Sequence, residues 1–139
     1  MKVFFDNCTS IVFAQTLDGF IRHQGHSAHH VSEIEDLPNG RHSADVEWID
    51  FLRRSNDVWI FVTGDHRVLK NQAERAALRK SGLHGFALAP AYQKTPFNQV
   101  ASMLVWRWPE IVQVTELLSP PTMYEMPIKA GTKMRQMPL

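Results

Sequence analysis

Short continuous apolar runs alternate along this chain with longer stretches in which apolar residues recur every three or four positions. Continuous runs are typical of strands covered on both faces, and the spaced pattern is typical of amphipathic helices. Strands that alternate with helices form right-handed βαβ units, so we expect an α/β fold with a parallel sheet covered on both faces. The predicted strands are 3–5, 28–31, 58–62 and 86–88, and the predicted helices are about 10–22, 43–53, 68–80 and 97–106.

Residues that start and stop helices set the expected boundaries. Thr9 or Ser10 can cap the first helix and Ser43 the second, because short polar side chains accept a hydrogen bond from the first turn. The third helix should turn Leu69, Ala73 and Ala76–Ala77 inward and stop at 81–82. The apolar segment 111–118 has a period that does not distinguish helix from strand.

The composition changes near residue 119, where prolines and basic residues become frequent. We therefore expect one domain over residues 1–118 and an extended or partly disordered tail over 119–139, and removal of this tail should preserve the fold. The segment 124–128 has an alternative interpretation, as a strand added to a partner protein.

Composition excludes several classes of protein. Of the 139 residues, 44% are apolar and 21% charged, as in ordinary globular domains. No apolar run approaches the roughly 18–20 residues of a membrane span, and no signal-peptide pattern opens the chain. The lone Cys8 rules out an intrachain disulfide and fits a cytoplasmic protein. The net charge of +1 leaves any attraction to nucleic acid to local patches.

Two aspartates, Asp6 and Asp65, each follow a predicted strand, and Asp45 lies on the inward stripe of the second helix. Residues just past the carboxyl ends of parallel strands line the crevice in which such sheets bind ligands. Carboxylates that meet there repel one another unless a cation lies between them. The three acids therefore predict a divalent-metal site of the kind used in phosphate chemistry, with Mg²⁺ or Mn²⁺ as the ion.

Each acid also has a purely structural interpretation. Asp45 can favour the start of its helix through the helix dipole, Asp65 can cap the third helix, and Asp6 can form a turn. Considered one at a time, the structural interpretations are the better ones. The coincidence of all three is what favours a metal site.

Three short segments resemble the acidic motifs of PIN-like domains: 4–7 (FFDN), 45–49 (DVEWI) and 62–65 (VTGD). Segments 70–79, 81–83, 88–90 and 94–97 resemble a bacterial PIN-like subfamily grouped with VapC toxins. The resemblance covers about residues 2–110. It implies a three-layer α/β/α sandwich with a central parallel sheet, in which Asp6, Asp45 and Asp65 are metal-binding, catalytic acids.

The same resemblance implies a Mg²⁺- or Mn²⁺-dependent ribonuclease that cuts RNA, often as a toxin held silent by an antitoxin, with a homodimer as a further expectation. Such an enzyme activates water for in-line attack on a phosphodiester. The alternative is a catalytically weakened PIN-like module that binds RNA or a protein partner. A phosphatase of the haloacid-dehalogenase type is disfavoured, because Cys8 stands where such an enzyme needs its second acid.

The chain departs from the family at its fourth acid, which many PIN domains carry shortly after the third. Arg67 stands there instead, and no Asp or Glu lies between Glu74 and Glu110. Glu74 and Arg75 are interpreted as ordinary surface charges. Single-metal catalysis or lost activity therefore stay open. Asn7 and Asn71 are candidate neutral supplements.

Several other side chains are candidates for RNA contact. Arg67 and Lys70 begin a basic stripe beside the acids, and His66 is placed either to contact a phosphate or simply to start a helix. Trp106 and Trp108 can stack on bases, although a core or interface position is more typical of such tryptophans. Cys8 is expected to be a small buried residue, since a nearby aspartate disfavours its thiolate.

Overall fold

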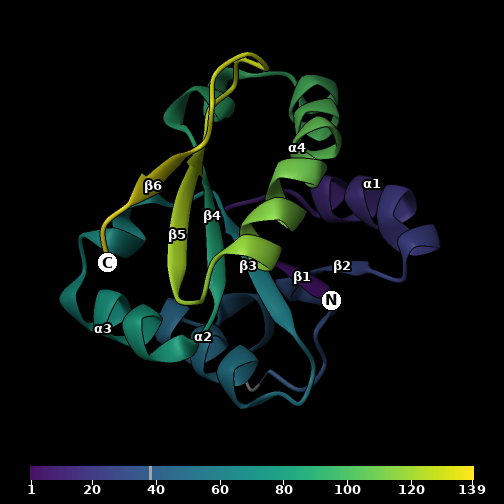
Figure 1. Ribbon diagram of the computed structural model, residues 1–139. Coiled ribbons are helices and arrows are strands. Elements are labelled where there is room, and N and C mark those ends of the chain that lie inside the picture. The colour runs from purple at the N-terminus through teal and green to yellow at the C-terminus, as the bar shows by residue number, and fades with distance from the viewer. Residues whose placement is uncertain (38) are drawn as a thin grey trace.

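The computed structural model describes residues 1–37 and 39–139, apart from the side chains of residues 66 and 68. Over this range six strands form one sheet in the order β2-β1-β3-β4-β5-β6, with helices on both of its faces (Figure 1). The strands are β1 (Lys2–Phe5), β2 (Ser27–His30), β3 (Trp59–Thr63), β4 (His84–Leu88), β5 (Thr122–Met126) and β6 (Arg135–Met137). The helices are α1 (Ile11–Ile21), α2 (Asp45–Arg54), α3 (Gln72–Ser81) and α4 (Phe97–Leu117).

Strands β1 to β5 run parallel, and only β6 is antiparallel to its neighbour. In the register, Phe5 at the end of β1 stands between His30 of β2 and Val62 of β3. The carboxyl ends of these three neighbouring strands are therefore level with one another. The residues that follow β1 and β3, including Asp6 and Asp65, consequently emerge side by side at one edge of the sheet.

The sheet divides the apolar core into two layers. Val3 and Phe5 of β1 pack with α1 and α4, whereas Phe4 points to the opposite face and packs with α2 and α3. Figure 1 shows the two helix pairs on opposite sides of the sheet. This alternation explains why the strands read as continuous apolar runs, and the predicted α/β fold with a mainly parallel sheet is confirmed.

The predicted cap is confirmed for the first helix and wrong for the second. Ser10 caps α1 by accepting a hydrogen bond from the Val12 amide at 3.1 Å. Helix α2 has Ala44 at its N-cap without a side-chain bond. Ser43 does not cap it because its hydroxyl instead donates to the Gly40 carbonyl at 2.7 Å, which closes the preceding short turn.

The third helix begins later than predicted. A short 3₁₀ segment, η4 (His66–Leu69), comes first, and Asn71 then caps α3 with its side chain. The later start rotates the buried face, so that Leu78 and Ser81 are buried while Ala73 is exposed. The expected inward face was therefore wrong at Ala73. Gly82 ends the helix in the left-handed region, at φ +66°, as its place after Ser81 predicts.

Helix α4 joins two segments that the sequence left separate, 97–106 and 111–118. It continues through Pro109, which removes one backbone donor. Leu104, Trp108 and Ile111 are buried on one face, and their packing against the core holds the helix together across the proline. Neither α4 nor any other helix in the described part of the chain combines the length and the apolar character needed to cross a bilayer.

The C-terminal segment is not an extended tail, because β5 and β6 belong to the sheet. Strand β5 pairs with β4 along its whole length, and its Met123 and Met126 are buried in the two core layers. The buried guanidinium of Arg107 in α4 donates to the carbonyls of Pro127 at 3.2 Å and Lys129 at 2.6 Å. These contacts tie the segment after β5 to the body of the protein, and correct the expectation of disorder.

Candidate active site

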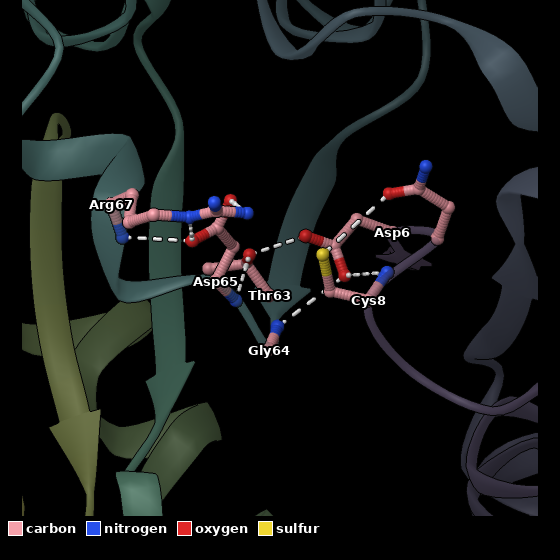
Figure 2. Close-up of polar contacts among 7 residues, drawn as sticks. Asp6, Cys8, Thr63, Gly64, Asp65 and Arg67 are labelled. Carbon is pink, nitrogen blue, oxygen red and sulfur yellow. Dashed lines mark hydrogen bonds and ion pairs between the residues drawn. The ribbon is translucent and has the colours of Figure 1, made fainter.

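Asp6 directly follows β1, and its carboxylate is buried at the carboxyl edge of the sheet. It accepts hydrogen bonds from the Thr63 hydroxyl, from the Gly64 amide at 3.3 Å and from the Cys8 amide at 3.2 Å (Figure 2). Two of these donors lie at the end of β3 and one lies in the loop after β1. The carboxylate therefore joins the ends of the two central strands and is held in a fixed orientation.

Burial dominates the ionisation of Asp6. It raises the pKa from the usual 3.8 to about 7, against the Thr63 and Gly64 hydrogen bonds, which favour the charged form. The negative charge of Asp45 raises the pKa further. Asp6 is thus a carboxyl group that exchanges its proton close to neutral pH, in a position where a cation would stabilise its charged form.

Gly64 permits the close approach of the two loops. A Cβ atom at this position would lie 2.5 Å from the Cys8 carbonyl oxygen, which is well inside van der Waals contact. The absence of a side chain lets the Gly64 amide reach Asp6. The glycine in the VTGD segment is therefore required by the backbone contact that forms the site.

Asp45 is the first residue of α2 and is half-buried. Its carboxylate accepts a hydrogen bond from the Trp48 indole at 2.9 Å, and the Trp48 ring stacks on Phe4 of β1 with 4.8 Å between centroids. Burial raises the pKa of Asp45 and the charge of Asp65 adds to this effect, while the Trp48 bond opposes it. The core thus orients Asp45, and the structure brings it into the electrostatic range of both other aspartates.

Asp65 caps the short η4 segment rather than α3. One carboxylate oxygen accepts from the Arg67 amide at 2.8 Å and from the Arg67 Nε at 3.0 Å (Figure 2). This ion pair raises the pKa of Arg67, whose side chain is 82% exposed. Arg67 therefore forms an ion pair with one of the acids of the candidate site. The side chain of His66 lies outside the described residues, so its expected role stays a prediction.

Glu74 in the first turn of α3 belongs to this group of acids, whereas the sequence pattern indicated an ordinary surface charge. Burial raises its pKa, and the charges of Asp45 and Asp65 raise it further. Asn71 positions it, because its side-chain oxygen accepts from the Glu74 amide at 3.1 Å. The pattern of an Asn followed three residues later by a Glu is the signal of a helix start that would have placed Glu74 here.

The remaining candidates lie around these four acids without joining them. Asn7 is exposed and donates to the Arg41 carbonyl at 3.2 Å, Lys70 is exposed, and Asn71 serves as the helix cap. Cys8 is exposed, so the expectation of a small buried residue was wrong. Partial burial of its sulfur and the negative charges of Asp6 and Asp65 raise the pKa of the thiol to about 11, which disfavours it as a nucleophile.

The donor set suits a hard divalent cation. All four acids, Asp6, Asp45, Asp65 and Glu74, supply carboxylate oxygens, the ligand type that Mg²⁺ and Mn²⁺ prefer. No group of three or more His, Cys, Asp or Glu residues in the described ranges is arranged to hold a metal ion. A Mg²⁺ site needs only one or two carboxylates, with water and substrate phosphate as the other ligands.

Comparison with known proteins places the chain in a broad family. The family described as "PIN like domain" matches residues 1–90, which is well over half of the 139 residues. The matched range contains all four acids and ends just after β4. The match does not distinguish the VapC-type subgroup, which stays a prediction. No curated protein matches the chain.

Proposed function

This chain belongs to the PIN-like domain family, and from that premise we propose that it is a Mg²⁺- or Mn²⁺-dependent ribonuclease. PIN-like domains are in general associated with nuclease activity. The observation that carries the proposal is the electrostatic coupling of Asp6, Asp45, Asp65 and Glu74: burial raises the pKa of Asp6, Asp45 and Glu74, and neighbouring carboxylates raise each of the three further. Such repulsion favours the binding of a divalent cation among the acids. It also supports a shared catalytic role for the four residues over a separate structural role for each.

Asp6 and Asp45 are the best-oriented ligands for the ion. Hydrogen bonds from Thr63 and Gly64 fix the Asp6 carboxylate, and the Trp48 indole fixes that of Asp45. Asp65 and Glu74 lie within electrostatic range of Asp45 and would add negative charge that attracts the ion. When bound, the ion supplies Lewis acidity that activates water and stabilises negative charge on the phosphodiester.

Arg67 supports RNA binding beside the acids, because a phosphate can compete with Asp65 for its exposed guanidinium. Lys70, exposed at the end of η4, adds a second positive charge. Both contacts would be screened by salt, so we expect the affinity for RNA to fall as the salt concentration rises.

Calorimetric titration with Mn²⁺ tests the metal site first. We expect the wild-type protein to bind, and Asp65→Asn and Glu74→Gln to bind at least tenfold more weakly. The matched control is Asp36→Asn, which removes an exposed acid outside the site and should bind like the wild type. Equal titrations by wild type and Asp65→Asn would contradict the proposal.

Cleavage of single-stranded RNA then separates the enzyme from a weakened binding module. We expect Mn²⁺-dependent cleavage by the wild type and none by Asp65→Asn. RNA binding without cleavage by the metal-loaded wild type would instead favour the alternative, in which the missing acid at Arg67 has cost the activity.

A toxin role rests on the resemblance to the VapC-grouped subfamily. It predicts that expression of the wild type in bacteria slows growth, and that expression of Asp65→Asn at the same level does not. Normal growth with an active, well-expressed enzyme would contradict the toxin role but not the nuclease activity.

A further inference from the structure

An uncharged pocket of about 180 Å³ lies next to the acids, on the α1–α4 side of the sheet edge. None of its lining residues carries a charge, in contrast to the acidic edge beside it. The lining consists of Cys8, Ser10, Phe13, Gly64, Leu88, Ala89, Tyr92, Gln93, Thr95 and Phe97. A pocket of this composition suits an uncharged, partly apolar group.

This pocket adjoins a second one of about 290 Å³ that reaches the candidate site. Cys8, Gly64 and Gln93 line both, and Asp65 and Arg67 line the second only. The two adjoining pockets therefore place a charged surface next to an uncharged one. A nucleotide has the same division, between a charged phosphate and an uncharged base.

The wall of the uncharged pocket offers an aromatic surface. Phe97 is the first residue of α4 and is 58% exposed. Its ring meets Phe13 of α1 edge to face, with 5.1 Å between centroids, so the buried Phe13 holds it in place. Tyr92 is fixed from behind, because its hydroxyl donates to the Pro127 carbonyl at 3.1 Å.

Gln93 is the polar residue best placed to form hydrogen bonds with a molecule bound in the pocket. It lines both pockets and is exposed, and its side chain makes no hydrogen bond within residues 1–37 and 39–139. Ser10 and Thr95, by contrast, are already bonded to the backbone. A free amide carries both donors and an acceptor, which is the combination that base edges require.

We propose that this pocket binds the base of an unpaired RNA nucleotide next to the phosphate that is cut, with Phe97 stacking on the base and Gln93 bonding to its edge. The proposal rests on the proposed ribonuclease function and adds a subsite that selects the base. The volume is adequate for one ring system, since a cavity of about 150 Å³ accommodates benzene. Stacking on aromatic side chains is the usual way in which unpaired bases are held.

Fluorescence anisotropy with labelled hexaribonucleotides A₆, C₆ and U₆ tests this subsite. The titrations are run at low salt in EDTA, so that metal-dependent cleavage does not consume the probe. We expect Phe97→Ala to weaken binding of the preferred hexamer by about fivefold or more, as the loss of one stacking contact predicts. Gln93→Leu should change the ratio of the three affinities more than their mean.

Two variants provide matched controls on the same helix. Trp106, a candidate for base stacking from the sequence, is 63% exposed on α4 but lines neither pocket, so Trp106→Ala should bind like the wild type. Gln99→Leu removes an exposed amide outside both pockets and should leave the affinity ratios unchanged. The subsite is wrong if Phe97→Ala binds like the wild type, if Trp106→Ala weakens binding equally, or if the wild type binds none of the hexamers.

Failure of the subsite and failure of the proposed function give different results. Metal-dependent cleavage with rates on the three hexamers that Phe97→Ala does not alter would retain the nuclease and overturn the subsite. Base-selective binding that Phe97→Ala abolishes, in a protein that binds no Mn²⁺, would retain the subsite and overturn the metal-dependent nuclease.

Discussion

Asp6 accepts three hydrogen bonds and still has a raised pKa, which shows that burial outweighs hydrogen bonding at this residue. Removal of a carboxylate from water costs more free energy than the Thr63, Gly64 and Cys8 donors restore. Ionisation of this one buried side chain therefore lowers the free energy of unfolding at neutral pH. A group of this kind is typical of functional sites, where stability is given up for chemistry.

The replacement Asp6→Asn should remove this cost in a pH-dependent way. In the folded protein the pKa is about 7 and in the unfolded chain about 3.8, so the wild type loses stability as the pH rises between these values, by up to about 4 kcal/mol. The neutral amide does not titrate. The stability of Asp6→Asn relative to the wild type should therefore increase from pH 4 to pH 8, as measured by urea unfolding in EDTA.

The exposed Asp36→Asn serves as the control, because it replaces an acid outside the candidate site by the same amide. A stability difference for Asp6→Asn that is the same at both pH values would show that the Asp6 carboxyl titrates normally in the folded protein.

Cys8 gives a second residue-scale prediction. Because its thiol pKa is about 11, the reactive thiolate is scarce at pH 8 even though the residue is exposed. Iodoacetamide should therefore modify Cys8 much more slowly than free cysteine at pH 8, and Asp6→Asn should accelerate the reaction. Modification of the folded wild type as fast as free cysteine would contradict the raised pKa.

The sequence predicted the site unevenly, for reasons that are local. Asp6 and Asp65 were identifiable because each follows an apolar run that ends at the same edge of the sheet. Glu74 was missed because the third helix was predicted to start about four residues early. That start places the glutamate in the middle of the helix, on its solvent-exposed face, instead of in the first turn. The cap at Asn71 decides that boundary, and its side chain has little weight in an apolar pattern.

At the scale of elements, buried strands were the easiest to predict and the C-terminal segment the hardest. Each predicted strand has a counterpart, since a run such as 58–62 must be covered on both faces. The segment 124–128 was interpreted as a possible strand added to a partner, but β5 instead pairs within this sheet, and its short sequence among prolines carries no sign of that. Its place depends on the open edge of β4 and on the buried Arg107, which are contacts distant in sequence.

Truncation after Leu118 tests this correction. Loss of β5 would uncover β4 and expose the core that Met123 and Met126 now cover, so we expect a protein that is largely unfolded by circular dichroism. A second truncation, after Lys133, removes only the β6 region and keeps the Arg107 contacts to Pro127 and Lys129. It should remain folded. A cooperative, native-like unfolding transition for the shorter protein would restore the view of a dispensable tail.

At the scale of the whole molecule, the edge of the sheet brings together side chains from both helical layers. Asp45 and Glu74 belong to the α2–α3 layer, whereas Phe13 and Phe97 belong to the α1–α4 layer. Asp6 and Asp65 follow the central strands between them. The sequence could not predict this meeting in detail, because it depends on how the two layers pack against a common sheet.

This division has a consequence for how such a protein can diverge. Helices α1 and α4 pack against each other on one face of the sheet, and their core is separate from that of α2 and α3. Substitutions in one layer can therefore accumulate while the other keeps its shape. Under the proposed function, related chains can keep the four acids while the opposite layer changes the base that the uncharged pocket selects.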